Sequence, residues 1–321
     1  MLLISIIILN WNGKQHLQEC LDSVLGQTYN SIEIILVDNG STDGSAQYVR
    51  DMYPEINVLE LDQNYGFCKG NNEGIRIAKG EYIVLLNNDT VADKQWLERL
   101  LECMISDKEL GFCASKLVSY YDKDTLDAAG DGFSVCGAGF KRGFGYSQKH
   151  YDESDYVFGA CAGAAMYKRS MLDEIGLLDE DFFITYEDSD LSFRAQLAGY
   201  KCKYQPQAVV YHKVNASMGT RSKTYVFYGH RNVEYVYFKN MPSSLLPRTI
   251  LQHIAYDIIA LCYFIYRKRG ITYIRAKLDF IKNFKIVMEK RKKIQQNKRV
   301  NDQYLLSILE KKWLRTRLKG K

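Results

Sequence analysis

The stretch Glu81-Tyr-Ile-Val-Leu-Leu-Asn-Asn-Asp-Thr90 decides how this chain is organised. Residues 82–86 are apolar without alternation, a pattern typical of a strand that is buried on both faces in a parallel sheet. Three polar side chains follow at once, Asn87, Asn88 and Asp89. Ligands of open α/β sheets bind just beyond the carboxyl ends of strands, and oxygen ligands of this kind suit Mg²⁺ or Mn²⁺. The stretch therefore predicts either a cation site or a plain strand-to-helix turn, in which Asn and Asp serve turn chemistry alone.

The composition is that of a globular protein whose charge is unevenly distributed. The chain has 321 residues, which is enough for about two domains. Its eight cysteines are scattered without a C-x-x-C pair, which argues for a reducing, cytosolic compartment and against a disulfide framework or a zinc site. Residues 239–321 carry 21 Lys and Arg against 5 Asp and Glu, whereas residues 1–238 carry 22 against 33. The basic tail predicts contact with a polyanion, either nucleic acid or an anionic membrane.

Two apolar segments bear on membrane insertion. Residues 2–9 lack a preceding basic region, so we expect a first buried strand rather than a signal peptide. Residues 250–266 are interrupted by Gln252, His253 and Asp257 and do not resemble a clean transmembrane span.

Apolar strands and amphipathic helices alternate through the first third of the chain. The expected strands are residues 3–9, 33–37, 57–61 and 82–86, and the expected helices are residues 16–24, 45–52, 66–78 and 94–105. This alternation predicts a mostly parallel, doubly wound α/β sheet. Because the first strand is not followed by G-x-G-x-x-G and no P-loop motif occurs, we do not expect a dehydrogenase or a P-loop NTPase. Asn10, Asp38 and Asp89 follow three of these strands and should meet at one edge of the sheet.

The second half of the chain is less regular. Residues 119–158 are rich in Gly, Tyr and Phe with little periodicity, which predicts either a functional loop over a site or a surface excursion. Residues 158–166 are rich in small residues, so a backbone there could approach a ligand closely. Short helices are expected over residues 168–175 and 191–198, and a short strand over residues 208–211.

Three carboxylates, Glu187, Asp188 and Asp190, crowd near a helix N-terminus, and a histidine, His212, follows a strand. Capping explains one carboxylate, so a catalytic base among the three is the sharper hypothesis. If the helix begins near Ser189, Asp188 lies just before it and can project into a cleft, whereas Asp190 is better placed to hold the helix. His212 is either structural or a metal ligand.

Seven segments occur in the order in which one known family has them. They are Ser5-Ile-Ile-Ile-Leu-Asn-Trp-Asn-Gly13, Val37-Asp-Asn-Gly-Ser-Thr-Asp43, Asn64-Tyr-Gly-Phe-Cys-Lys-Gly-Asn-Asn72, Leu85-Leu-Asn-Asn-Asp-Thr90, Gly163-Ala-Ala-Met166, Tyr186-Glu-Asp-Ser-Asp-Leu191 and His212. With them the chain resembles a family 2 inverting glycosyltransferase of the GT-A fold, in the rhamnosyltransferase-like and galactofuranosyltransferase-like branch. The resemblance covers roughly residues 1–240.

The resemblance implies a nucleotide-sugar donor, a divalent cation (Mg²⁺ or Mn²⁺) and a lipid-linked or oligosaccharide acceptor. It implies that Asp188 is the general base and that Asp89 and His212 bind the cation. The positions that match the family's donor-nucleotide site are Asn10, Asp38, Lys69, Asn72 and Asn88. Asn87 stands where many family members have Asp, which leaves one carboxylate for the cation. Rhamnose from a dTDP donor is the first expectation for the sugar, followed by UDP-hexoses.

Two other classes of function would leave different signs in the sequence. A catalytically degenerate scaffold that binds nucleotide sugars would have lost Asp89, Asp188 or His212, and all three are present. A nucleic-acid-binding protein would carry basic and aromatic residues in a recognisable binding motif, and the tail has none. We therefore expect an enzyme with no nucleic-acid partner.

We expect two parts, a GT-A catalytic domain over residues 1–240 and a basic, helical tail over residues 241–321. Basic clusters at 267–269 and 290–293 follow an apolar stripe, which predicts an interfacial helix on an anionic membrane surface. The protein would then be cytoplasmic and peripheral on the inner face of the cell membrane. Alternatively, the stripe packs onto the body or a partner subunit. Its residues are Ile250, Leu251, Ile254, Ile258, Leu261, Cys262 and Ile265.

Overall fold

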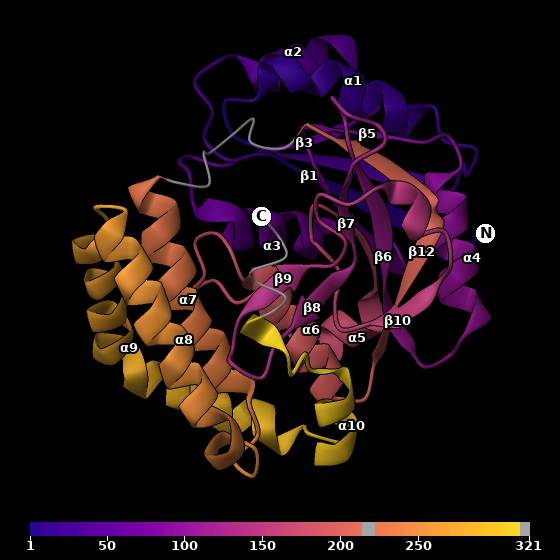
Figure 1. The fold of residues 1–321 in the computed structure, drawn as a ribbon. Coiled ribbons are helices and arrows are strands. Elements are labelled where there is room, and N and C mark those ends of the chain that lie inside the picture. The colour runs from indigo at the N-terminus through magenta and orange to yellow at the C-terminus, as the bar shows by residue number, and fades with distance from the viewer. Residues whose placement is uncertain (214–221, 315–321) are drawn as a thin grey trace.

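Within residues 1–213 and 222–314, which the computed structural model describes, a ten-stranded mixed sheet forms the centre of the molecule (Figure 1). The strands follow one another in the order β10-β12-β6-β11-β4-β1-β2-β3, with β5 paired to β12 and β7 paired to β6. The strands of this sheet are β1 (Ile4–Asn10), β2 (Ile32–Asp38), β3 (Asn57–Glu60), β4 (Tyr82–Asn87), β5 (Thr90–Ala92), β6 (Leu110–Ser119), β7 (Leu126–Ala129), β10 (Asp155–Val157), β11 (Ala164–Lys168) and β12 (Lys201–His212). A separate two-stranded sheet pairs β8 (Asp131–Phe133) with β9 (Gly139–Lys141).

Helices cover both faces of the main sheet, as the sequence predicts for a doubly wound fold. Ile6 and Ile8 of β1 join the core under α1, α2 and α4, whereas Ile7 between them joins the core under α3. The helices of the body are α1 (Lys14–Leu25), α2 (Ser45–Met52), α3 (Gly66–Ile77), α4 (Trp96–Ser106), α5 (Arg169–Ile175) and α6 (Glu187–Leu197), with a 3₁₀ turn η1 (Gln148–His150). An α/β fold with a mostly parallel first half is therefore confirmed.

The parallel strands β3, β2, β1 and β4 end at one edge of the sheet. In their register Asn10 lies opposite Asp38, and Leu9 lies opposite Asn87. The polar residues after β1, β2 and β4 thus meet at the carboxyl edge, as expected from the sequence.

The structure corrects several boundaries. Strand β6 runs through the middle of the sheet, although no strand was expected there, and β12 is longer than the expected residues 208–211. Helix α6 begins at Glu187 rather than near Ser189, so Asp188 lies in its first turn. Carboxylates are favoured in a first helical turn because the N-terminal N–H groups there are unpaired. The expectation that Asp188 precedes the helix is therefore wrong.

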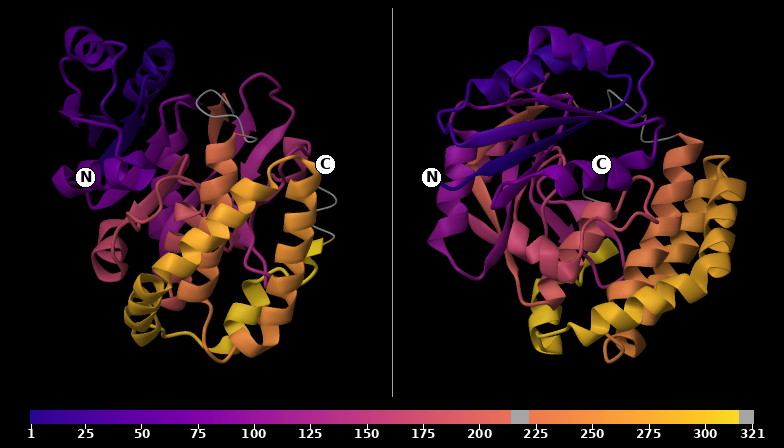
Figure 2. Two further views of the ribbon diagram at one scale, coloured as in Figure 1. Left: turned by 90° about the vertical axis from the view of Figure 1, so that its left-hand side faces the viewer. Right: turned by 180° about the vertical axis from the view of Figure 1, so that it is seen from behind.

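Three long helices form a layer on one flank of the body (Figures 1 and 2). They are α7 (Lys223–Asn240), α8 (Leu246–Tyr266) and α9 (Gly270–Gln296), and a short helix α10 (Asp302–Ile308) follows them. Helix α9 packs against α7, and its Phe280 and Val287 join the same core as Phe182 of the body. The expected tail therefore contacts the expected catalytic domain extensively. Residues 315–321 of that tail lie outside the described residues.

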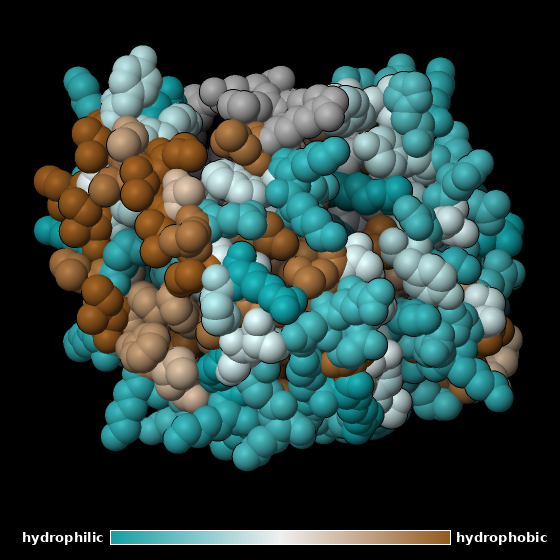
Figure 3. Space-filling view, turned by 60° about the horizontal axis from the view of Figure 1, so that its bottom comes forward, coloured by the Kyte–Doolittle hydropathy of each residue, from teal (hydrophilic) through white to brown (hydrophobic). Residues whose placement is uncertain are grey.

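Helices α8 and α9 expose a large apolar surface, which we call the α8–α9 face (Figure 3). Its residues are Leu251, Ile254, Ile258, Ile265, Ile271, Ile274, Leu278 and Ile281. Ile250 of the expected stripe instead packs against the core, and Leu261 is half-buried. Among the described helices, the length and composition of α8 would also allow it to cross a membrane.

Candidate active site

A cavity of about 1210 Å³ opens at the carboxyl edge of the parallel strands. Asn88 and Asp89, which follow β4, form part of its wall. Asp188 at the start of α6 and His212 at the end of β12 line the same cavity. Four residues predicted from three separate motifs thus line one cavity.

Asp89 and His212 face each other inside this cavity. Strand β5 pairs with β12 so that Thr90 lies opposite His212, which brings Nε2 of His212 to 3.3 Å from Oδ1 of Asp89. Burial alone would raise the pKa of Asp89 and lower that of His212. The hydrogen bonds and opposite charges of His212 and its two carboxylate partners, Asp127 and Asp89, outweigh the effect of burial. The pKa of Asp89 is therefore lowered, and that of His212, which also contacts Asp127, is raised to about 9.

A second carboxylate holds the far side of the imidazole. Asp127 Oδ2 lies 2.9 Å from Nδ1 of His212, and the Asp127 side chain is only 1% exposed. Lys141 Nζ donates to both oxygens of Asp127, at 2.9 and 2.8 Å. Burial opposes ionisation of Asp127, but His212 and Lys141 outweigh it and lower its pKa to about 2.

The side chains of Asp89 and His212 fit a divalent cation. With Nδ1 bonded to Asp127, Nε2 of His212 points at Oδ1 of Asp89 across 3.3 Å, and both atoms would offer a lone pair to a cation once Nε2 has lost its proton. Imidazole nitrogen and carboxylate oxygen both serve as ligands for transition metals such as Mn²⁺. The pair leaves other coordination positions open toward the cavity for oxygens of a bound ligand.

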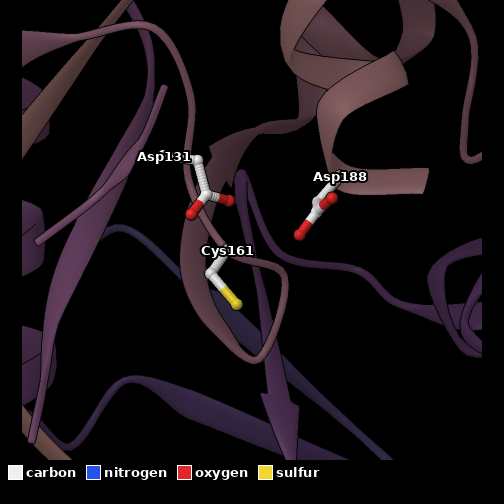
Figure 4. Close-up of side chains that lie close together, drawn as sticks. All are labelled: Asp131, Cys161 and Asp188. Atoms are coloured by element: carbon white, nitrogen blue, oxygen red, sulfur yellow. The ribbon is translucent and has the colours of Figure 1, made fainter. Parts of the chain in front are cut away.

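Asp188 enters the cavity from a strained backbone segment. Thr185 and Tyr186 both have φ of 67°, a left-handed conformation that is costly for residues other than glycine. Oδ1 of Asp188 accepts a hydrogen bond from the Ser189 N–H at 2.6 Å, and burial raises the pKa of Asp188. Its carboxyl group faces that of Asp131 across the cavity, close to the Cys161 thiol (Figure 4).

The two neighbouring acids have different surroundings. Asp190 is fully buried and paired with Arg194 at 2.9 Å and Lys239 at 2.8 Å, so it fastens α6 as expected. Glu187 is buried against Asp188, and burial together with that charge raises its pKa to about 8. A carboxyl group with this pKa is mostly protonated at neutral pH and is a poor proton acceptor there.

The residues matched to the donor nucleotide divide into two groups. Asn88 lines the cavity and donates a hydrogen bond to Asn10 at 2.7 Å, and Asp38 lies beside Asn10 at the end of β2. Gly13 permits this packing, because a Cβ there would lie 2.2 Å from the Asn88 amide nitrogen. Burial raises the pKa of Asp38, which accepts a hydrogen bond from the Ser41 N–H.

Asn10, Asp38, Lys69 and Asn72 do not line the cavity themselves, and Lys69 and Asn72 make other contacts. The Lys69 amine lies 3.6 Å from the centre of the Tyr65 ring. The Asn72 amide donates to Leu178 O at 2.8 Å and to Glu180 at 3.0 Å, and its oxygen accepts from the Leu178 N–H. Asn72 therefore anchors the segment that leads to Asp188.

Comparison with known proteins identifies the family. Residues 5–176, more than half of the chain, match the model of Glycosyl transferase family 2. The chain belongs to this family. GlyG, a glycosyltransferase of Streptococcus pneumoniae, is 34% identical over 125 residues, which are 38% of this chain and 41% of that protein. Poly-beta-1,6-N-acetyl-D-glucosamine synthase of Staphylococcus epidermidis is 27% identical over 276 residues, 81% of this chain and 64% of the synthase. The chain thus spans less than two thirds of either relative.

Solved structures confirm the GT-A fold for this family 2 chain. The mannosyltransferase PcManGT from Pyrobaculum calidifontis, solved with GDP-Man and Mn²⁺, has a TM-score of 0.55 at 16% identity, over 87% of this chain and 86% of that one. GalNAc-T7, solved with UDP, GalNAc and Mn²⁺, has a TM-score of 0.58 at 19% identity, over 81% of this chain and 58% of that one.

Sequence reasoning missed three residues of the cavity region in this family 2 chain, Asp127, Asp131 and Lys141. All three come from residues 119–158, the segment that the sequence indicated only as a functional loop or a surface excursion. An aspartate on each side of Ala128-Ala-Gly130, in a segment rich in Gly and aromatic residues, was the available signal.

Proposed function

We propose that this family 2 protein transfers a sugar from a nucleotide-sugar donor to a hydroxyl group of a growing glycan, with inversion at the anomeric carbon. The observation that carries the proposal is the convergence of Asp89, His212 and Asp188 on one cavity. A reaction of this kind needs a group that stabilises the departing nucleoside diphosphate and a base for the acceptor hydroxyl.

Asp89 and His212 would hold a divalent cation, Mg²⁺ or Mn²⁺. When bound, the cation would stabilise the negative charge that develops on the leaving diphosphate. Both structural neighbours were solved with Mn²⁺, which supports this assignment. His212 contributes a neutral ligand and Asp89 a charged one, so Asp89 should matter more.

Asp188 would act as the general base. The acceptor oxygen attacks C1 of the sugar while the bond from C1 to the diphosphate oxygen breaks, and the hydroxyl proton passes to the Asp188 carboxylate. A single displacement of this kind inverts the configuration at C1. The surroundings of the neighbouring acids support this choice, because Asp190 is committed to Arg194 and Lys239 and the pKa of Glu187 is raised to about 8.

The donor nucleotide would lie near Asn10, Asp38 and Asn88. Asn88 lines the cavity, and its side-chain amide donates a hydrogen bond to Asn10. For Lys69 and Asn72 a direct contact would require side-chain movement, because the Asn72 amide is already bonded to the 178–180 segment.

The identity of the donor sugar and nucleotide can be determined by measuring turnover. Rhamnose from dTDP-rhamnose, the choice of the rhamnosyltransferase-like branch, comes first and UDP-hexoses second. The relative named as a poly-N-acetylglucosamine synthase supports including UDP-N-acetylglucosamine. We would screen these donors with lipid-linked and oligosaccharide acceptors, with MnCl₂ or EDTA, and determine the anomeric configuration of the product by NMR. Turnover with inversion supports the proposal, whereas donor binding without turnover would favour the degenerate scaffold.

The α8–α9 face would dock on an anionic membrane surface. Leu251 is 75% exposed and Ile271 is 72% exposed, which is unusual for side chains of this size in water. Residues 246–296, which include both helices of this face, carry 12 Lys and Arg against 3 Asp and Glu. Each basic residue near an anionic leaflet contributes about 1 kcal/mol. Because α8 also packs through His253 and Tyr256, we propose that it lies in the interface rather than across the bilayer.

Such docking would keep the enzyme in the cytoplasm, peripheral on the inner face of the cell membrane. A lipid-linked acceptor would be presented on the same surface. The eight free cysteines agree with a reducing compartment.

A further inference from the structure

Asp127 lies at an irregular position of the sheet beside the proposed cation site. Strand β7 pairs with β6 so that Leu117 lies opposite Ala128 and Val118 opposite Leu126, which leaves Asp127 as the extra residue of a β-bulge. Bulges re-aim a side chain and are frequent next to active sites. Here the bulge accompanies a buried carboxylate whose Oδ2 lies 2.9 Å from Nδ1 of His212.

We propose that Asp127 is a positioning residue for the cation site, acting through His212. The proposal rests on the function proposed above. A carboxylate accepts hydrogen bonds and does not donate them when ionised, so Asp127 requires a proton on Nδ1 of His212. Nε2 is then the nitrogen that can exchange its proton for a cation, and it is the one that faces Asp89 at 3.3 Å. A partner of this kind fixes both the tautomer and the ring orientation of a metal-binding histidine.

Lys141 completes the arrangement from the other side. Its amine donates to both oxygens of Asp127, so the buried carboxylate has a counter-charge whether or not a cation is present. The carboxylate therefore cannot rotate away from the imidazole without breaking two charged hydrogen bonds. Asp127, Lys141 and His212 thus form a preassembled support that comes from β7, β9 and β12.

The inference is tested by titrating the purified protein with MnCl₂ and measuring free Mn²⁺ by electron paramagnetic resonance. Asp127→Asn should weaken Mn²⁺ binding by roughly 10- to 100-fold, the range found when such partners are removed. Asp152→Asn is the matched control, because it breaks another Asp–Lys pair, Lys116–Asp152, that lies outside the cavity lining. It should leave the affinity within about 2-fold. Urea unfolding without Mn²⁺ checks that each variant is folded, and Asp127→Ser serves as a second variant.

A double-mutant cycle separates positioning from a general structural effect. If Asp127 acts through His212, Asp127→Asn should cost no more than His212→Gln, and the double variant should bind like His212→Gln within about 2-fold. Additive losses, a loss larger than that of His212→Gln, or unchanged affinity in folded Asp127→Asn would overturn the inference. Failure of the wild type to bind Mn²⁺ would instead remove the proposed cation site itself, and with it this inference.

Discussion

Nε2 of His212 lies 3.3 Å from Oδ1 of Asp89, although the two residues are far apart in the sequence. The pairing of β5 with β12 brings them together, and Asp127 holds the other nitrogen of the same ring. Asp188 completes the cavity from the first turn of α6. In the proposed function, Asp89 and His212 would serve the leaving diphosphate and Asp188 would serve as the base for the acceptor.

Loss of Asp89 should be more damaging than loss of His212. Asp89→Asn removes the charged ligand and should lower turnover by more than about 100-fold, whereas His212→Gln should lower it by roughly 10- to 100-fold. The diphosphate supplies further oxygen ligands in either case. Turnover is measured against MnCl₂ concentration, and equal, metal-independent rates in Asp89→Asn and wild type would contradict the assignment.

The fold was predictable where each strand carries its own signal. Strand β4 is a continuous apolar run, and it was found from the sequence. Strand β6 was missed because Ser115 and Lys116 interrupt its apolar run, yet both are buried. The Trp96 indole donates to Ser115, and Asp152 pairs with Lys116. Those partners are known only once the chain is folded, so the pattern alone could not identify this strand.

The site residues were likewise predictable where they lie in a motif that the sequence itself shows. Asp89, Asp188 and His212 each lie within two residues of the start or end of a regular element, in a recognisable motif. Asp127 depends on a bulge, and a bulge is defined by the pairing of two strands rather than by either sequence. The start of α6 was predicted too late. The residue before the helix, Tyr186, adopts a left-handed conformation that normally favours glycine, so its residue type does not mark the boundary.

Asp190 should govern stability rather than catalysis. Asp190→Asn leaves the buried amine of Lys239 and the guanidinium of Arg194 with one carboxylate fewer, which should cost roughly 3–5 kcal/mol of unfolding free energy. Asp302→Asn is the control, because its pair with Lys298 is partly exposed and should contribute less than about 1 kcal/mol. Urea denaturation measures both, and equal losses would refute this role.

Stability should depend on pH through a buried cluster between α7, α8 and α9. Burial would raise the pKa of Glu234, but His253 and Lys277 lower it from 4.5 to about 2. The stabilisation by this carboxylate is therefore complete above about pH 4.5 and is lost as the pH falls toward 2. His253 has a raised pKa, despite burial, through its bond to Glu234, so its contribution is complete below about pH 6.5 and is lost as the pH rises through the raised value.

Glu234→Gln should therefore flatten the loss of unfolding free energy between pH 4.5 and 2 and lower that free energy at pH 7 by roughly 3–5 kcal/mol. Glu289→Gln, on the exposed side of α9, should change it by less than about 0.5 kcal/mol. Urea midpoints across this pH range provide the measurement. If Glu234→Gln showed the same pH dependence of stability as the wild type, the proposed role of Glu234 would be wrong.

Membrane binding should depend on the α8–α9 face. Ile258 is 57% exposed on α8, and Ile105 is 58% exposed on α4, so the two offer matched substitutions. Ile258→Glu should reduce co-sedimentation with anionic vesicles by about 10-fold, because it places a charge in the apolar contact, whereas Ile105→Glu should not. Equally poor binding of the wild type to anionic and neutral vesicles would exclude the proposal.

The most direct test of the proposed chemistry measures donor binding and sugar transfer separately in Asp188→Asn. A positioned base contributes on the order of 10²- to 10⁴-fold, so the single-turnover transfer rate should fall by that factor. Donor affinity should stay within about 3-fold of the wild type, because the base acts on the acceptor hydroxyl rather than on donor binding. Glu187→Gln should lose much less, since a mostly protonated carboxyl at neutral pH is not the acceptor of the proton. A transfer rate in Asp188→Asn close to that of the wild type would contradict the account.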